Sequence, residues 1–500
     1  MRKIIRIVAV GLSVLLTIIT LEACGTIRGI FCKGINYEIK DGHTMILNGS
    51  GPMKEIPPIE MRAKEPFYSN GENNSITRIE IREGIASVGE SAFFLFRSLE
   101  EVLLPSTILS VEEYAFGHCD SLQKIVFPEA TETIGSFAFE GCSSLKEVYF
   151  SEGLRSIGKG AFDSCPLEEV YIPSTLVDIG DGAFEGCTSL REFQVAEDNP
   201  RYTVLDGVLF DKANKALVAF PAGKVLEEYL IPEGIEIIAP SAFSGSRITR
   251  IYIPETVKDI GSGCFVGSEM LEMVTLPEGL TIIRSGLFNG CISLTTVNIP
   301  KTVMEIESGA FNRCDSLKNI VLDENPNFCV KDGILYNSTE TRLFLYPATL
   351  EETQFIASDL QVIDPYAFSN NHYLKIVILP SSMESIGFGA FQNCDNLTTI
   401  HLPVEIRDFA DCVFWGCSSL SSISLPHGVQ KIGVFTVSSC KNLKDIKLPS
   451  SVREIHESAF SGGLPSLTKI EFDGSETLWN MIDQGSGCRA LEKVEIVFLQ

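Results

Sequence analysis

The chain has 500 residues, of which 45% are hydrophobic and 9% aromatic, and its formal net charge is −25 at pH 7. The apolar content is ample for a folded protein, so long-range disorder is excluded. The negative charge argues against nucleic acid as a partner, because an acidic surface repels phosphate backbones.

The N-terminal segment has the layout of an export signal. Three basic residues among the first six precede fifteen uncharged residues at 7–21. This length is within the range of a signal-peptide core and shorter than the ~20 residues needed to span a bilayer. The run Leu21–Cys24 resembles the lipobox of bacterial lipoproteins. The resemblance implies a signal peptide at 1–23, a lipid on Cys24 and membrane attachment through that lipid. The alternatives are an ordinary secretory signal and an uncleaved anchor with a coincidental cysteine.

The residues that follow predict a short tether at 24–34 and an N-terminal β cap at 35–75. Within the cap, an Asp-Gly turn at 41–42 separates two candidate strands, 36–40 and 44–48. A cap is needed there because the repeats that follow are expected to stack on one another, and the open end of such a stack exposes apolar surface and unpaired strand edges.

From residue 76 to 472 the sequence repeats with a period of 22 or 23 residues. One phenylalanine marks the same position in each unit, and only two longer gaps, of 59 and 57 residues, break the spacing. Regular repetition on this scale predicts a solenoid of stacked coils. The fourteen residues in this slot are Phe93, Phe116, Phe139, Phe162, Phe184, Phe243, Phe265, Phe288, Phe311, Phe368, Phe391, Phe414, Val437 and Phe460.

Each unit follows the pattern Leu-x-x-Val-x-Ile-Pro, then a turn, then Val-x-x-Ile-Gly-x-x-Ala-Phe-x-x-Cys-x-Ser. Alternation in stretches such as 145–150 predicts a half-buried strand, and the proline marks where strand pairing stops. The glycine after isoleucine is expected to permit a tight turn. A unit this short is below the ~40 residues at which a chain folds unaided, so it must bury its apolar side chains against neighbouring units.

These motifs resemble the BspA-like leucine-rich repeats of bacterial surface proteins over nearly the whole span 76–472. The resemblance implies a mainly β repeat solenoid with a parallel sheet on one side. The run 472–479 looks like the terminal cap of that family, which places a C-terminal cap at 473–500. The resemblance also implies a protein of the bacterial cell envelope, lipid-anchored at the outer membrane or cell surface, with a role in adhesion.

The two longer gaps contain related inserts, near 196–228 and 322–355. The inserts align at a constant offset of 126 residues, starting from the Asn-Pro pairs at 199–200 and 325–326. In each insert, two apolar stretches flank a polar turn, which predicts a β-hairpin.

The polar residues do not form a recognisable catalytic or metal-binding constellation. The six histidines lack metal-ligand spacing, and the sequence has no phosphate-binding loop or nucleophile elbow. Nine of the fifteen cysteines occupy one repeat slot, which serine or asparagine fills elsewhere, so the slot is interpreted as a place for a small buried side chain. Disulfides between stacked coils remain open. The sequence therefore predicts a protein without catalytic residues, metal ions or cofactors, and not an enzyme.

The period of two along a strand places the residues on either side of the core Val or Ile outward. In the first half of the array these positions form an apolar row beside a mostly acidic one, whereas the second half is largely small and polar. Such a row is typical of an interaction surface, but cross-strand stabilisation of the sheet, or cover by the first insert, also explains it. The candidate ligand-binding residues are Leu103, Val126, Tyr149, Tyr171 and Tyr252 in the apolar row and Glu147 and Glu169 in the acidic row.

Three functions are consistent with the sequence. The first follows from the resemblance and is adhesion to host or matrix proteins, or to other cells, through the sheet face. The second is a glycan-binding protein for nutrient capture, with aromatic platforms on the sheet. The third is a periplasmic structural scaffold without an external ligand. The ligand would thus be a protein or a glycan, with the membrane contacted through the lipid anchor.

Overall fold

The computed structural model describes residues 27–54, 75–322, 324–406, 408–484, 491 and 494–499. These residues fold into short β-strands joined by turns, with one helix among them, α3 (Glu476–Trp479). No helix in this part of the chain is long and apolar enough to cross a membrane. The predicted export signal and Cys24 lie outside the described residues.

The chain divides into two compact units. One unit comprises residues 1–184 with 196–200, and the other comprises residues 185–195 with 201–500. The division falls at the first insert, where the distance between successive repeat slots is longest.

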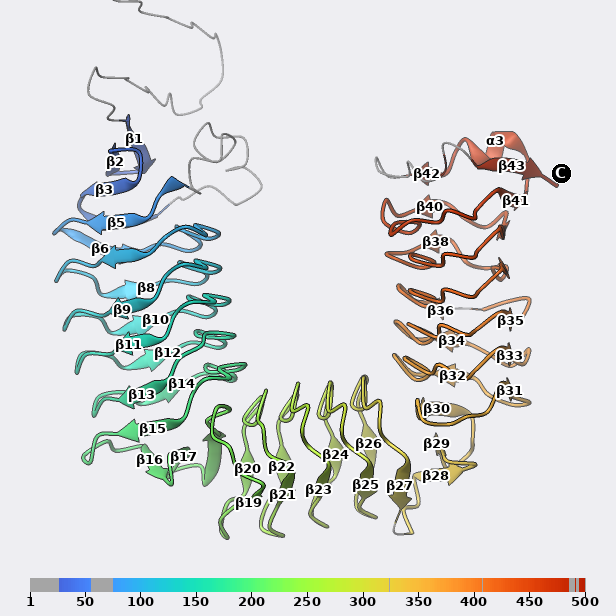
Figure 1. Cartoon of the computed structure of the whole chain (residues 1–500), viewed down its shortest axis with the longest axis horizontal. Coiled ribbons are helices and arrows are strands. Elements are labelled where there is room, and N and C mark those ends of the chain that lie inside the picture. The colour runs from blue at the N-terminus through green and yellow to red at the C-terminus, as the bar shows by residue number, and fades with distance from the viewer. Residues whose placement is uncertain are drawn as a thin grey trace, which may run out of the picture. The chain divides into compact units, whose positions relative to one another are not determined.

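In the first unit, successive coils contribute strands to two parallel ladders (Figure 1). Each strand pairs with the equivalent strand of the neighbouring repeat, so that Val148 lies opposite Ile125. The sequence predicted a sheet on one side only, because the strands of the second ladder are too short to show alternation. The first ladder contains β5 (Arg78–Ile81), β7 (Glu101–Leu103), β9 (Lys124–Val126), β11 (Glu147–Tyr149) and β13 (Glu169–Ile172). The second contains β4 (Gly51–Pro52), β6 (Ile85–Val88), β8 (Ser110–Val111), β10 (Thr133–Ile134), β12 (Ser156–Ile157) and β14 (Asp178–Ile179).

The second unit repeats this two-ladder arrangement on either side of the second insert. It begins with β15 (Glu192–Val195) before the first insert. Its first ladder contains β19 (Glu228–Leu230), β21 (Arg250–Tyr252), β23 (Met273–Thr275), β25 (Thr296–Ile299), β27 (Asn319–Leu322), β31 (Gln354–Ile356), β33 (Ile376–Ile378), β35 (Thr399–His401), β37 (Ser422–Ser424), β39 (Asp445–Pro449), β41 (Lys469–Asp473) and β43 (Glu495–Phe498). Its second ladder contains β20 (Ile237–Ile238), β22 (Asp259–Ile260), β24 (Ile282–Ile283), β26 (Glu305–Ile306), β32 (Val362–Ile363), β34 (Ser385–Ile386), β36 (Asp408–Phe409), β38 (Lys431–Ile432), β40 (Glu454–Ile455) and β42 (Asp483–Gln484).

The phenylalanine slot forms a column of stacked rings in each unit. In the first unit the ring centroids of Phe116, Phe139 and Phe162 follow one another at 5.3 Å, and the last two rings are inclined by only 3°. In the second unit Phe265 and Phe288 stack at 5.5 Å. Buried Leu, Val and Ile side chains surround these rings and complete the core. Because rings such as Phe139 and Phe288 contact the rings before and after them, the column couples neighbouring coils to one another.

Each insert is a three-stranded antiparallel extension of one coil. In the first insert β16 (Tyr202–Leu205), β17 (Val208–Asp211) and β18 (Ala216–Ala219) pair in order, and β18 then joins the second ladder beside β20. In the second insert β28 (Phe328–Lys331), β29 (Ile334–Asn337) and β30 (Arg342–Leu345) pair in the same way. The predicted hairpins are confirmed.

The inserts also supply rings to the column, which the sequence analysis missed. Phe220 stacks on Phe243 at 5.2 Å, and Tyr346 stacks on Phe368 at 4.8 Å. With these two residues the number of occupied slots rises from fourteen to sixteen. Each insert is therefore an enlarged coil of the solenoid.

The Asn-Pro pair that opens each insert has a structural role. Asn199 and Asn325 are buried, and each donates through its side-chain amide to the preceding coil. The acceptors include the carbonyl oxygens of Pro173, at 2.7 Å, and Pro300, at 2.8 Å. A proline carbonyl at the end of a strand thus accepts a hydrogen bond from the insert in addition to one from its own coil.

The glycine after isoleucine is required for a reason other than the expected tight turn. A Cβ atom on Gly158 would lie 2.5 Å from the backbone nitrogen of Ser136 in the preceding coil, and one on Gly387 would lie 2.4 Å from that of Pro365. Glycine is used here because successive coils approach each other too closely for a side chain.

The N-terminal end differs from the predicted tether. Residues 27–32 form β1 (Ile27–Cys32), which pairs antiparallel with β2 (Ile35–Lys40), and β2 pairs with β3 (Thr44–Gly49). The strand forms because its apolar side chains reach the core: the Phe31 ring stacks on Phe93 at 5.3 Å and Cys32 is buried. At the other end, Trp479 packs against Phe472 at 5.4 Å.

Phe288→Ala is expected to lower the free energy of unfolding by about 3–5 kcal/mol, because it removes a fully buried ring from between Phe265 and Phe311. Phe288→Val should cost less, since Val437 fills the same slot in another coil. Urea unfolding followed by circular dichroism measures both variants. The exposed Val126→Ala serves as control, with an expected change within ~0.5 kcal/mol. A loss below about 1 kcal/mol for Phe288→Ala would contradict a central role for the ring column.

Candidate functional site

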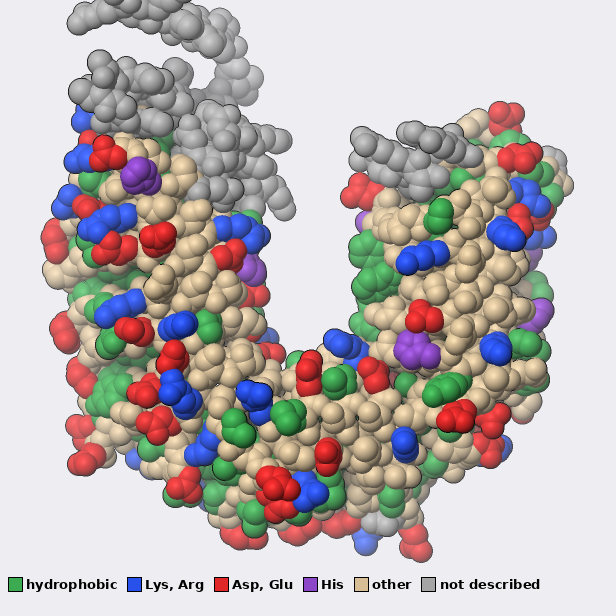
Figure 2. All heavy atoms as spheres, viewed as in Figure 1, with side chains coloured by type: hydrophobic (Ala, Val, Ile, Leu, Met, Phe, Trp, Pro, Cys, Tyr) green, Lys and Arg blue, Asp and Glu red, His purple; other side chains and the backbone are tan. Residues whose placement is uncertain are grey.

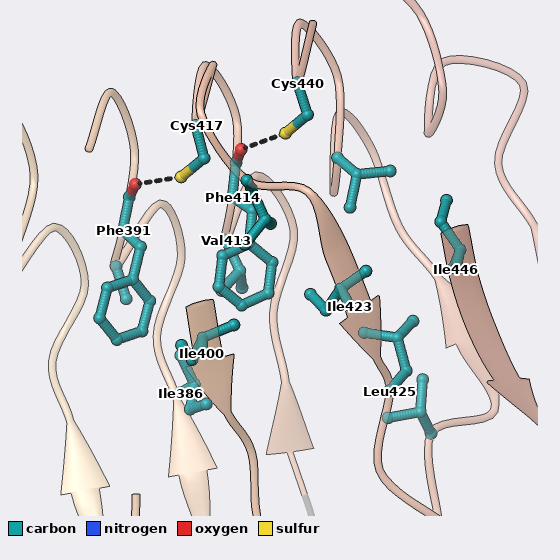
Figure 3. Close-up of a cluster of buried hydrophobic side chains, with 14 of the residues drawn as sticks. Ile386, Phe391, Ile400, Val413, Phe414, Cys417, Ile423, Leu425, Cys440 and Ile446 are labelled. Atoms are coloured by element: carbon teal, nitrogen blue, oxygen red, sulfur yellow. Dashed lines mark hydrogen bonds between the residues drawn. The ribbon is translucent and has the colours of Figure 1, made fainter. Parts of the chain in front are cut away.

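The cysteine slot of the repeat is a hydrogen-bonding position. In eight coils the Sγ atom donates to the carbonyl oxygen of the slot phenylalanine one coil back. Figure 3 shows two of these bonds, among them Cys417 to Phe391 at 3.1 Å. Ser268 replaces cysteine in another coil, and its hydroxyl donates to the Phe243 carbonyl at 2.8 Å. The slot therefore requires a small donor, whereas the sequence analysis recognised only that it is small and buried.

Burial makes the thiols of Cys291 and Cys440 poor nucleophiles. It raises the pKa of Cys291 and that of Cys440 to about 12, so the thiolate is not populated near neutral pH. Within the described residues, no group of three His, Cys, Asp or Glu side chains is arranged to hold a metal ion. The cysteine slot serves the stack, and the candidate functional site lies on the outward surface.

An apolar row runs along the outward face of the first ladder in the first unit. It consists of Leu103, Val126, Tyr149 and Tyr171, which occupy the same position on β7, β9, β11 and β13. Between 41% and 52% of each residue is exposed. Four successive coils thus present apolar side chains at the strand spacing of ~4.8 Å.

A charged column borders the apolar row. Lys124 Nζ lies 3.5 Å from a carboxylate oxygen of Glu147 and 4.3 Å from the centre of the Tyr149 ring. The Tyr149 hydroxyl donates to Glu147 at 2.9 Å, which fixes the direction of the ring. Exposed ion pairs of this kind contribute little stability, so these contacts orient the side chains more than they hold the fold. The column contains three glutamates and one lysine, namely Glu101, Lys124, Glu147 and Glu169.

The face is hollowed where β7 and β9 lie side by side. A depression of about 660 Å³ lies there, and both the apolar row and the charged column contribute to its walls. Binding sites typically combine an apolar surface with a few polar groups in this way. The residues that line the depression include Glu101, Leu103, Gln123, Lys124, Val126 and Pro128.

Tyr252, the fifth predicted residue of the apolar row, lies on β21 and belongs to the second unit. Its own column there holds exposed apolar residues that the sequence analysis missed. Leu230 pairs with Tyr252 and is 67% exposed, and Ile356 pairs with Ile378 and is 64% exposed. The sequence analysis missed Leu230 and Ile356 because both lie on strands of the enlarged coils.

The repeat that carries these columns matches a family model, the BspA type leucine-rich repeat region, with six copies over residues 67–191, 219–342 and 361–480. The chain belongs to the BspA-type leucine-rich repeat family. The first break, 192–218, spans most of the antiparallel strands of the first insert, and the second, 343–360, begins within β30 of the second insert.

Three solved structures resemble this BspA-type chain. A leucine-rich cell surface protein from Faecalibacterium prausnitzii is 19% identical, with 91% of this chain and 97% of that chain covered and a TM-score of 0.44. A leucine-rich repeat protein from Eubacterium ventriosum is 20% identical, with 88% and 95% covered and a TM-score of 0.45. The pneumococcal vaccine antigen PcpA is 17% identical, with 93% and 97% covered and a TM-score of 0.40. At these identities the likeness concerns the fold alone. No curated protein matches the sequence.

Alkaline pH is expected to destabilise the BspA-type stack through its buried thiols. A thiol in the unfolded chain ionises near pH ~8.5, whereas Cys291 and Cys440 keep their protons up to about pH 12 in the fold. Above pH ~8.5 the unfolded state therefore binds fewer protons than the folded state, and stability falls by up to ~1.4 kcal/mol per pH unit and thiol.

Urea unfolding under reducing conditions between about pH 7.5 and 10 measures this dependence. Cys291→Ser should keep the hydrogen bond, as Ser268 does, and give a shallower pH dependence than the wild type. Equal slopes for the two proteins would contradict the assignment to the thiols.

Proposed function

We propose that this chain is a non-enzymatic binding protein of the bacterial cell envelope, which attaches to host or matrix proteins or to other cells. The apolar row carries the proposal, because four exposed apolar side chains in register on a sheet are stabilised when a partner covers them. Two of the four are tyrosines, which are favoured in protein interfaces.

The chemistry of the surface indicates the kind of partner. The apolar row is bordered by the charged column, in which Lys124 pairs with Glu147 while Glu169 is exposed. The whole chain carries a net charge of −25. A protein surface with an apolar centre and basic side chains around it would be attracted by this charge and would cover the row.

A non-enzymatic role is supported by the chemistry of the described residues. The thiols of Cys291 and Cys440 donate to backbone carbonyls, and burial raises the pKa of each so that it keeps its proton near neutral pH. The polar groups around the apolar row are paired glutamate, lysine and tyrosine side chains, an arrangement that suits recognition.

The proposed attachment to the envelope is through a lipid on Cys24. Cys24 lies outside the described residues, and its lipidation rests on the resemblance of Leu21–Cys24 to a lipobox. β1 begins at Ile27, so only two residues, Gly25 and Thr26, would separate the anchor from the first strand, over a distance of at most about 11 Å. The N-terminal strands would then lie close to the membrane, and the repeats would continue from them.

Replacing Tyr149 and Tyr171 together by Ser is expected to weaken binding to immobilised matrix proteins or to intact cells by about tenfold or more, because two aromatic anchors are lost. Surface plasmon resonance against a panel of matrix proteins measures the effect. Tyr252→Ser tests the second unit separately. Thr275→Ala with Ser424→Ala, at the same strand position in other coils, is the matched control and should bind as the wild type does. Full binding by the double tyrosine variant with an unchanged melting temperature would place the site elsewhere.

Cys24→Ser is expected to release the protein from membranes or to block removal of residues 1–23, because the lipid-accepting thiol is lost. Membrane fractionation and the mass of the mature N-terminus report the two outcomes. Cys32→Ser, in the buried part of β1, controls for the loss of a nearby cysteine and should leave processing unchanged. A Cys24→Ser protein that matures normally and stays membrane-bound would rule out the lipobox.

A further inference from the structure

A second surface of the second unit carries aromatic side chains at the turns between coils. We call it the aromatic edge, and it consists of Tyr366, Phe388, Trp415 and Phe435, one residue from each of four successive coils. Phe388 and Trp415 are each 38% exposed. The Tyr366 and Phe388 rings lie 5.4 Å apart, and the Trp415 and Phe435 rings stack at 5.8 Å with their planes inclined by 28°. Figure 2 shows hydrophobic side chains gathered along the edge of the coils that carry β34, β36 and β38.

The backbone at the aromatic edge favours small residues, yet it holds large rings. Tyr366 and Phe435 have φ of 61° and 52°, in the left-handed region. In earlier coils of the same unit, Gly263 and Gly286 occupy this position with φ of 62° and 63°. A bulky side chain in this region is disfavoured, and such residues are concentrated at binding sites.

Trp415 is the more informative of the two tryptophans in the chain. Trp479 is buried against Phe472 in the C-terminal part and serves packing. Trp415 instead presents its indole at the surface, supported from one side by Phe435. A tryptophan kept partly in water and stacked on a second ring forms a flat platform for a ligand.

Polar groups, three amides and one carboxylate, accompany the rings. Asn393 Nδ2 donates to Asn370 Oδ1 at 3.0 Å, and Asn370 Nδ2 donates to Asp315 Oδ1 at 3.0 Å. Gln392 is half-buried beside them, in the same turn position that Trp415 occupies one coil further on. Amide side chains both donate and accept hydrogen bonds, as sugar hydroxyl groups do.

The same edge continues into a depression. Ser438 and Ser461 follow Trp415 at the same turn position, and Ser438 Oγ donates to the Ser461 carbonyl at 2.8 Å. Ser461 lines a depression of about 590 Å³ together with Lys441 and Glu457. The platform therefore leads along the coils toward a hollow with hydrogen-bonding walls, which is the usual form of a ligand site.

We infer that the aromatic edge binds a neutral polysaccharide, whose sugar rings stack on Trp415 and Phe435 and whose hydroxyl groups meet the adjacent amides. Four coils at ~4.8 Å place the rings along about 14 Å, which suits an extended polymer. The net charge of −25 repels anionic polymers, and the amides beside the rings match a neutral ligand. This site is separate from the apolar row, so it adds an activity to the proposed adhesion.

Tryptophan fluorescence of the full chain tests the inference. In a Trp479→Phe variant, Trp415 is the sole tryptophan. Titration with a soluble β-glucan, a mannan and a xylan should give a saturable change in its emission with at least one of them, and isothermal titration calorimetry should give the same affinity. The absence of a saturable change with all three polysaccharides would overturn the inference.

Variants of the aromatic edge then locate the binding. Trp415→Ala should weaken polysaccharide binding by about tenfold or more, and Trp415→Phe should restore most of it, because a flat ring is retained. Gln392→Ala should weaken binding without removing a ring. The double Tyr149→Ser and Tyr171→Ser variant should bind polysaccharide as the wild type does, which separates this site from the apolar row.

Polysaccharide binding by Trp415→Ala equal to that of the wild type would overturn the inference. Loss of matrix-protein binding alone in that variant would also overturn it, since it would identify a protein-docking edge.

Discussion

The exchange of backbone hydrogen bonds between neighbouring coils is the constraint on which the rest of the structure depends. A coil of 22 or 23 residues can pair only some of its own N–H and C=O groups, so the others pair with the coils on either side, as Phe116 N does with the Ala138 carbonyl at 2.8 Å. This pairing brings successive coils so close that Gly158 has no room for a Cβ atom. It also stacks the slot phenylalanines and brings a thiol within hydrogen-bonding distance of the phenylalanine carbonyl one coil back, as Cys165 is to Phe139. The residue types of the repeat are therefore consequences of one spacing.

The same spacing explains which features could be predicted from the sequence. The position of Tyr149 was predictable because alternation on a strand fixes which side chains point outward. Most strands of the second ladder, such as β10, have two residues and show no alternation, so the sequence does not distinguish them from turns. Phe220 lies in the ring column, but a hairpin replaces the part of the repeat motif that normally precedes the phenylalanine. A search for the whole motif therefore does not find this slot. The hydrogen bond of Cys417 depends on a carbonyl 26 residues earlier, and only the serine and asparagine substitutions in that slot hinted at it.

Two kinds of surface arise on this scaffold, and they differ in what the fold demands of them. Outward strand positions such as Val126 and Thr275 make no contact that the stack requires, so their chemistry is free to vary from coil to coil. Turn positions such as that of Phe435 have a backbone conformation suited to glycine, so a large side chain there works against the local preference. Apolar residues on strands are consequently weak indicators of binding when taken singly, and aromatic residues at left-handed turn positions are stronger ones.

The offset of 126 residues between the two inserts has a consequence for how such a chain changes in length. Consider the block that runs from Asn199 to the residue before Asn325. Its two ends lie at the same point of a coil. Copying or deleting the whole block joins one turn to its equivalent, so the flanking coils keep their pairing register and their stacked rings. Copying a fraction of a coil would break both. The molecule is thus built to be lengthened or shortened by recombination in whole blocks, with each step adding or removing one hairpin and one set of outward columns.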